Sequence, residues 1–251
     1  MRKRFDFIAV LFLISLFFSS CGSLSVETFH ENGAVVTSSP IASEVGLTIL
    51  KQGGNAFDAA VGVGFALAVT HPEAGNIGGG GFVLTYDASA GEVNALDFRE
   101  KAPENATVDM FLDSNGYVLE NNSLLGSKAA GVPGTVAGLY SLWEKYGSLE
   151  WYQLLQPAYK LADTGFLLDQ YLVNSFVSYK KALQYFPETK SIFFAGNTSP
   201  KTGDRFTQKD LAATIQRIAL DSLKGFYSGE TADLIVETME KYDGLISHDD
   251  L

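Results

Sequence analysis

The chain has 251 residues, of which 46% are hydrophobic and 19% are charged. This balance is typical of a folded protein with a sizeable core, and it excludes wholesale disorder. The formal net charge of −11 disfavours nucleic acid as a partner, because its phosphates attract basic surfaces.

The N-terminal segment, residues 1–20, has the pattern of a secretory signal peptide. It has a basic start, and its apolar run, residues 7–18, is too short to span a bilayer, which takes about 20 residues. The single cysteine, Cys21, follows this run and is placed as in a bacterial lipoprotein; residues 21–32 then read as a polar tether. We expect a lipid on Cys21 that anchors an exported protein to the membrane, in the periplasm or at the cell surface. The alternative is a plain cleaved signal with an incidental cysteine.

The folded part is expected to run from residue 33 to residue 251 and to begin with a β-prone stretch at residues 34–37. Ser39 and Pro40 then predict a helix start, a serine cap followed by proline at the first helical position. Gly53 and Gly54 fit the end of that helix.

A second helix is predicted from Asn55 through residues 56–69, which are apolar all round and therefore expected to be buried. Asn55 and Asp58 are interpreted as structural residues that cap this helix. The adjacent Thr70 and His71 end the helix, and we reject them as a nucleophile and base pair.

A β-hairpin is predicted next. The glycine-rich run of residues 75–81 leads into a strand at residues 82–86, and a turn at residues 87–91 leads back through a strand at residues 92–99. Side-chain-free backbone at the glycines is expected to let the hairpin pack closely.

Beyond Pro103 the pattern is mostly helical. A short piece at 107–111 and a turn at 113–116 come first, and longer helices are expected near residues 135–143, 150–162, 170–184, 207–222 and 229–241. Residues 247–251 have a serine cap and acidic first turn, so they resemble a helix start more than a finished domain. The order of elements predicts the α+β class.

Several kinds of chemistry are excluded by pattern. The histidines at 30, 71 and 248 have no metal-ligand spacing with one another or with Cys21. The glycines at 78–81 lack a following lysine and precede a strand, so they do not form a phosphate loop. No cofactor or metal is predicted.

Arg99 is the candidate binding residue, because a guanidinium offers a rigid fork that fits a carboxylate with two parallel hydrogen bonds. The plain alternative is a surface salt bridge with Asp97 or Glu100, an interaction that contributes little.

Six motifs, in the same order, resemble the large-subunit signature of the γ-glutamyltranspeptidase family. They are Gly-Gly-Asn-Ala-Phe-Asp-Ala-Ala at 53–60, Leu-Ala-Val-Thr-His-Pro at 67–72, the glycine-rich run at 75–82, Asp-Phe-Arg-Glu-Lys-Ala-Pro at 97–103, Gly-Val-Pro-Gly-Thr-Val-Ala-Gly at 131–138 and Gln-Pro-Ala at 156–158. The likeness covers about residue 33 to the last residue.

The resemblance implies the four-layer αββα fold of the N-terminal-nucleophile hydrolases, here only its large-subunit front part of helix pair, β-hairpin and helix-rich block. It implies a precursor that cuts itself, and a new N-terminal threonine that attacks the γ-glutamyl amide of glutathione or a related compound. Arg99 matches the arginine that grips the substrate's α-carboxylate.

The same resemblance implies that the nucleophilic threonine lies beyond Leu251. The chain is therefore expected to be inactive alone, to need the small subunit and the rest of the large subunit as partners, and to expose sheet edges and apolar faces. Two alternatives stay open: a non-catalytic lipoprotein that binds small acidic ligands or persists as a remnant, and a portion of a related cephalosporin or glutaryl acylase.

Overall fold

The computed structural model describes residues 31–251 of the chain. The chain divides into two units, residues 1–34 and Val35–Leu251, and all elements below belong to the second. The predicted signal peptide, Cys21 and most of the predicted tether lie outside the described residues.

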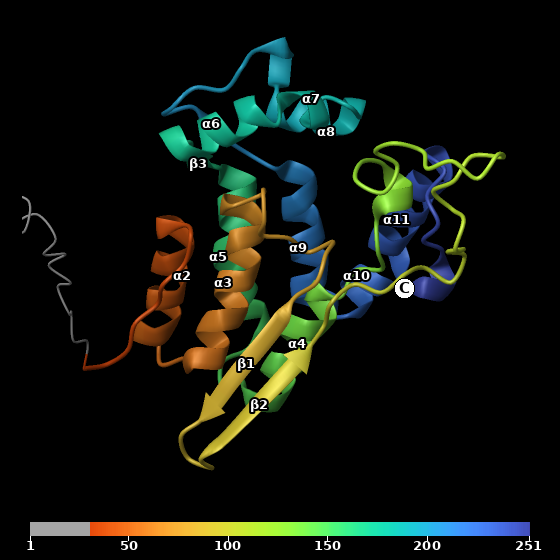
Figure 1. Ribbon diagram of the computed structural model, residues 1–251. Coiled ribbons are helices and arrows are strands. Elements are labelled where there is room, and N and C mark those ends of the chain that lie inside the picture. Colours follow the sequence, from red (N-terminus) through yellow and green to blue (C-terminus); the bar gives the residue numbers. More distant parts are fainter. Residues whose placement is uncertain (1–30) are drawn as a thin grey trace, which may run out of the picture. The chain divides into compact units, whose positions relative to one another are not determined.

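The second unit is rich in helices and holds two small antiparallel sheets (Figure 1). The α-helices are α2 (Pro40–Lys51), α3 (Ala56–Thr70), α4 (Thr135–Tyr146), α5 (Trp151–Thr164), α6 (Gln170–Ser178), α7 (Lys180–Leu183), α8 (Pro187–Phe193), α9 (Lys209–Asp221), α10 (Lys224–Tyr227) and α11 (Gly229–Lys241). The strands are β1 (Phe82–Asp87), β2 (Glu92–Asp97), β3 (Phe166–Leu167) and β4 (Arg205–Phe206). Short 3₁₀ turns are η1 (Ser127–Ala129), η2 (Ala195–Asn197) and η3 (His248–Asp250).

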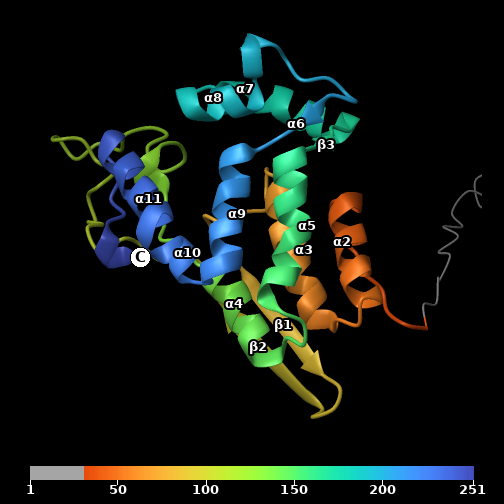
Figure 2. The same ribbon diagram turned by 180° about the vertical axis from the view of Figure 1, so that it is seen from behind.

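The core lies between helices α2, α3, α5 and α9, which pack in that order, as Figures 1 and 2 show from opposite sides. The side chains of Phe65, Leu154 and Ile215 are completely buried there. A Cβ atom on Gly62 of α3 would lie 2.2 Å from the Ile49 side chain of α2. The glycine therefore lets α2 and α3 pack closely. No helix within residues 31–251 is both long and apolar enough to cross a membrane.

The two N-terminal helices begin as predicted. The Ser39 side chain accepts a hydrogen bond from the Ala42 N–H, with Pro40 in the first helical position. Asn55 and Asp58 form a reciprocal capping box at the start of α3, which confirms their structural role. Thr70 is the last residue of α3, as predicted; its hydroxyl donates to the Ala66 carbonyl over 2.9 Å and is buried.

Strands β1 and β2 form the predicted hairpin, with Phe82 opposite Asp97 and Asp87 opposite Glu92. Helix α4 lies behind the hairpin in Figure 1 and in front of it in Figure 2, so it covers one face. The other face carries large apolar side chains that stay exposed, namely Phe82, Leu84, Tyr86 and Val93.

Three sequence predictions are wrong. Residues 34–37 form no strand, and Val36 is 93% exposed, because no strand in the described part lies beside them to pair their backbone groups. The mostly helical pattern predicted beyond Pro103 is absent from residues 103–134, which form turns, η1 and two isolated bridges, one of them to Lys101; the turn predicted at residues 113–116 is found. Local side-chain bonds compete with helix there: Asp113 accepts hydrogen bonds from the backbone N–H groups of Asn115 and Tyr117.

The third concerns residues 170–184, where the single predicted helix is two, α6 and α7. Tyr179 separates them with a backbone conformation of φ −94° and ψ 11°, which interrupts the helical turn. Helix α8 begins at Pro187 in its first turn and was not predicted.

Candidate functional site

Arg99 lies just beyond the end of strand β2, at a pocket of about 380 Å³. The hairpin pairing continues for one more residue, since the Phe98 N–H donates to the Gly81 carbonyl over 3.0 Å. The Arg99 N–H then donates to the Asp97 carboxylate over 2.9 Å, which turns the chain out of the strand. We call this cavity the Arg99 pocket; it is lined by Arg99, Glu100, Lys101, Ala102, Pro103, Ala106, Met110, Phe111, Lys128, Ala129, Ala130 and Gly131.

The glycine-rich loop fixes the backbone on which Arg99 is mounted. A Cβ atom on Gly80 would lie 2.5 Å from the Phe98 carbonyl oxygen, 2.7 Å from the Glu100 nitrogen and 2.8 Å from the Arg99 Cα. Since all three are backbone atoms that cannot turn aside, only glycine allows this approach. The prediction that the glycines serve close packing of the hairpin is confirmed for Gly79, Gly80 and Gly81, whereas a Cβ atom on Gly78 would meet no atom within 4 Å.

The start of helix α4 holds the same loop from its other side. The Gly79 carbonyl accepts hydrogen bonds from the N–H groups of Gly134, at 2.7 Å, and Thr135, at 3.0 Å. The Asn76 side-chain oxygen accepts from the Gly79 N–H and from the Thr135 hydroxyl. Loop, helix start and hairpin end therefore form one hydrogen-bonded support for Arg99.

Two further hydrogen bonds hold the segment that follows Arg99. The Val132 N–H donates to the Lys101 carbonyl over 2.9 Å, and the Glu104 N–H donates to the Asp250 carboxylate over 2.8 Å. Burial alone would raise the pKa of Asp250, but the N–H groups of Ser247 and Glu104 hold that pKa below its ordinary value. The carboxylate therefore stays ionised near neutral pH and joins this segment to the turn η3.

The charge of the Arg99 pocket is mostly positive. Arg99, Lys101 and Lys128 line it against one carboxylate, Glu100, and within residues 31–251 none of the three cations forms an ion pair. The expected alternative, a salt bridge of Arg99 with Asp97 or Glu100, is absent from this part of the chain. An exposed guanidinium without a carboxylate partner is free to bind the carboxylate of a small molecule.

Of these pocket residues only Arg99 was predicted as a ligand-binding residue, and its role stays a prediction. Lys101 could have been predicted as a pocket residue, because it lies two residues after Arg99 in sequence. Lys128 comes from a segment with no sequence signal that links it to the hairpin. The two histidines in the described part, His71 and His248, belong to no group of three potential metal ligands there.

The sequence pattern of the family described as gamma-glutamyltranspeptidase matches residues 42–251. The chain belongs to the γ-glutamyltranspeptidase family. It is 47% identical over 222 residues to the glutathione hydrolase proenzyme of Pseudomonas sp. (strain A14), an alignment that covers 88% of this chain and 38% of that relative. The chain thus spans well under half the length of this curated relative.

Solved structures share the fold of this chain. The γ-glutamyltranspeptidase of Helicobacter pylori superposes with a TM-score of 0.87 at 46% identity, over 89% of this chain and 64% of that one. A cephalosporin acylase from Bacillus halodurans superposes with a TM-score of 0.77 at 26% identity, over 92% and 45% of the two chains. The predicted fold class, a front part of the N-terminal-nucleophile hydrolase sandwich, is confirmed.

Proposed function

We propose that this chain serves γ-glutamyl transfer or hydrolysis on glutathione and related γ-glutamyl compounds. The observation that carries the proposal is the Arg99 guanidinium, which lines a cationic pocket without an ion-pair partner in the described residues. Family membership and a relative named glutathione hydrolase support the reaction class. The higher identity to the H. pylori γ-glutamyltranspeptidase, 46% against 26% for the cephalosporin acylase, favours this reaction over acylase chemistry.

In this proposal Arg99 binds the α-carboxylate of the γ-glutamyl group through two charge-assisted hydrogen bonds. The glycine-loop support fixes the position of the Arg99 backbone, and a carboxylate held at Arg99 places the γ-carbonyl of the same molecule for attack. A threonine that this chain does not supply is the nucleophile, and its own α-amine is the base. The chain alone is then inactive, and its partners are the small subunit and the rest of the large subunit.

A chimera tests the proposal directly. The aligned 222-residue segment of the Pseudomonas sp. proenzyme is replaced with that of this chain, and turnover of γ-glutamyl-p-nitroanilide is measured. We expect the chimera to be active, and Arg99→Gln to lower kcat/KM about 100-fold, since a lost charge-assisted pair costs about 3 kcal/mol.

Two controls accompany the chimera. Lys51→Gln, an exposed charge at the end of α2, is expected to leave kcat/KM unchanged, and the 251-residue chain alone is expected to show no turnover. A chimera that self-cleaves and turns over equally well with Arg99→Gln would overturn the role of Arg99. Turnover by the chain alone would overturn the placement of the nucleophile.

We further propose that the chain is exported and carries a lipid on Cys21, for which the sequence pattern is the support. Growth of an expressing bacterium with labelled palmitate is expected to label the chain, and Cys21→Ala is expected to abolish the label. Equal labelling of both would contradict the anchor.

A further inference from the structure

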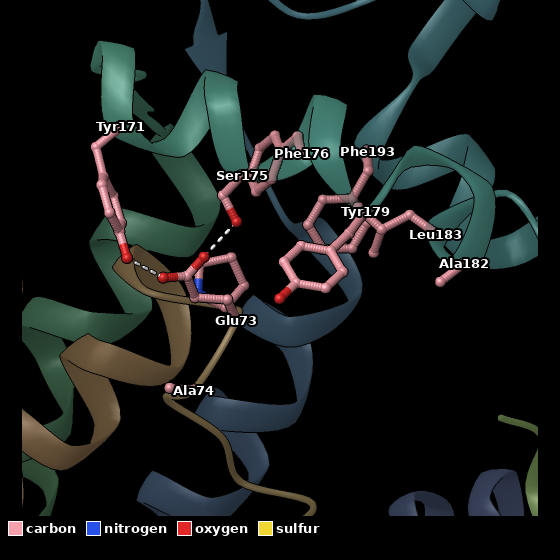
Figure 3. A pocket seen from close by; sticks show the side chains of 10 residues that line it. Glu73, Ala74, Tyr171, Ser175, Phe176, Tyr179, Ala182, Leu183 and Phe193 are labelled. Atoms are coloured by element: carbon pink, nitrogen blue, oxygen red, sulfur yellow. Dashed lines mark hydrogen bonds between the residues drawn. The ribbon is translucent and has the colours of Figure 1, made fainter. Parts of the chain in front are cut away.

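A second cavity, of about 580 Å³, opens between the loop after α3 and the helices α6 to α8. It shares no lining residue with the Arg99 pocket. Figure 3 shows its features: the carboxylate of Glu73, the phenol rings of Tyr171 and Tyr179, and the apolar rings of Phe176 and Phe193. We call this cavity the Glu73 pocket; its size is that of ordinary small-molecule sites.

The carboxylate of Glu73 is held by two hydroxyl groups. Tyr171 donates to one carboxylate oxygen and Ser175 to the other, and both donors belong to helix α6 (Figure 3). The hydrogen bond from Ser175 lowers the pKa of Glu73 most and that from Tyr171 next, so this pKa stays below its ordinary value. The anion is therefore present throughout the neutral range and is fixed in position by donors that carry no charge.

The charge of Glu73 has little compensation. No lysine or arginine within residues 31–251 pairs with it, and the nearest basic group, Nε2 of His71, lies 3.8 Å from its oxygen. Each carboxylate oxygen accepts one hydroxyl bond, so each keeps acceptor capacity for a further donor. A fixed anion with free acceptor sites at a cavity favours a cationic hydrogen-bond donor.

The walls around Glu73 favour a cation that carries an apolar body. The Phe176 and Phe193 rings meet edge to face with centroids 5.0 Å apart, and Phe176 is almost fully buried. The Tyr171 and Tyr179 rings are instead 57% and 61% exposed and flank the Glu73 side chain in the view of Figure 3. Aromatic faces attract organic cations through their π electrons, and the apolar wall buries the rest of such a ligand.

We propose that the Glu73 pocket binds a small organic ammonium ion with an aromatic or aliphatic body. The ammonium group donates hydrogen bonds to the Glu73 carboxylate between the two phenol rings, and the body lies against Phe176, Leu183 and Phe193. The site is formed by the loop Pro72–Ala74 and by helices α6 to α8, and its ligand does not depend on the proposed γ-glutamyl reaction.

The test measures binding to the purified 251-residue chain by isothermal titration calorimetry or ligand-observed NMR at neutral pH. The probe is phenethylammonium chloride, and its neutral analogue is 2-phenylethanol, which has the same body with a hydroxyl in place of the ammonium. We expect saturable binding of the ammonium and about tenfold weaker binding of the alcohol, because only the cation pairs with the carboxylate.

Three variants localise that binding. Glu73→Gln keeps the shape and a hydrogen-bond acceptor but removes the charge, and is expected to weaken phenethylammonium about tenfold while 2-phenylethanol is unaffected. Tyr179→Leu keeps an apolar wall but removes an aromatic face, and is expected to weaken only the ammonium, about threefold. Glu240→Gln, an equal charge change at an exposed position of α11, is the matched control and is expected to bind as the unaltered chain does.

Circular dichroism melts show whether each variant folds. Tyr179→Leu keeps the test decisive if Glu73→Gln does not fold, since the Tyr179 side chain is 61% exposed and its replacement removes little packing. Equal binding of the ammonium and the alcohol would reduce the cavity to an ordinary apolar groove and overturn the proposal. So would folded Glu73→Gln or Tyr179→Leu variants that bind the ammonium unchanged, or the absence of ammonium binding up to about 20 mM, the weak end of small-ligand affinity.

Discussion

At the scale of single residues, Asp58 joins two parts of the chain that lie far apart in sequence. Its carboxylate accepts hydrogen bonds from the Asn55 N–H at 2.9 Å, from the Ser148 N–H at 2.9 Å and from the Ser148 hydroxyl at 2.5 Å. The residue is completely buried. One carboxylate therefore caps α3 and fixes the loop between α4 and α5.

The cap role of Asp58 was predictable, because the capping box is a pattern of four neighbouring residues. The link to Ser148 was not predictable, because it joins positions 90 residues apart and depends on how α3 and α4 pack. The same limit applies to the Arg99 pocket: the sequence points to Arg99 within its motif, and only the folded chain brings Lys128 to it.

Asp58→Asn tests the double role. One of the two carboxylate oxygens would become an NH₂ group, which would face the N–H groups that now donate hydrogen bonds to it. We therefore expect the free energy of unfolding to fall by about 2–4 kcal/mol. Urea unfolding followed by circular dichroism measures this. Asp109→Asn, at an exposed position where the carboxylate accepts only the Thr107 hydroxyl, should change stability by less than about 0.5 kcal/mol. Equal losses in the two variants would show that Asp58 contributes no more to stability than an exposed carboxylate, against the double role.

At the scale of elements, the hairpin, the helices with a clear apolar period and the turn at residues 113–116 were predictable, and the rest of the segment 103–134 was not. That segment lies beside α11 (Figure 1) and is held by distant contacts such as the bond from Glu104 to Asp250. Polar side chains that bond their own backbone, such as Asp113, decide its turns. A residue-by-residue pattern contains such local turns but not the distant contacts.

The glycine loop gives a prediction for the fit between elements. Gly80→Ala would place a Cβ atom against backbone of Phe98, Arg99 and Glu100, so the loop must move away from the end of the hairpin. We expect a loss of about 1–3 kcal/mol in unfolding free energy, the usual cost of overpacking. Gly78→Ala is the matched control in the same loop, since its Cβ would meet no atom within 4 Å. Thermal and urea melts that show the same stability for both variants would contradict this account.

The contact between α8 and α11 gives a pH-dependent prediction. Lys241 donates to the Glu188 carboxylate over 2.5 Å and Tyr242 donates to it over 2.8 Å, which lowers the pKa of Glu188 to about 2. Because this pKa is below the ordinary value of 4.5, the contribution to stability is present above pH 4.5 and is lost as the pH falls through about 2.

Glu188→Gln measures that contribution. The variant is expected to melt at a lower temperature than the unaltered chain at pH 7, and the difference is expected to shrink as the pH falls below 4.5. The group is exposed, so the effect is small and should also shrink in about 0.5 M salt, where screening is strong. A melting difference that is constant from pH 7 to pH 3 would show that the ion pair is not its cause.

At the scale of the whole molecule, the hairpin is a small sheet with an uncovered apolar face. Residues Phe82, Leu84 and Tyr86 alternate along β1 on that face and are between 65% and 76% exposed, and Val93 opposes Tyr86 from β2. Within residues 31–251 no further strand pairs with either edge of this sheet. The expected exposure of sheet edges and apolar faces is therefore found in the described part of the chain.

An apolar face beside open edges predicts self-association of the isolated chain, because both the side chains and the unpaired backbone groups are satisfied by a second copy. Size-exclusion chromatography with light scattering should show mass that rises with concentration over about 1–100 μM, a range in which weak apolar interfaces form.

Leu84→Lys, at the centre of the exposed face, should shift the chain toward monomer with little change in its melting temperature, since the side chain is 76% exposed. Leu220→Lys is the matched control, a leucine 62% exposed on α9, a helix that packs against α5 and α10. A chain that stays monomeric at all concentrations, or one in which both lysine variants act alike, would show that the hairpin face does not drive association.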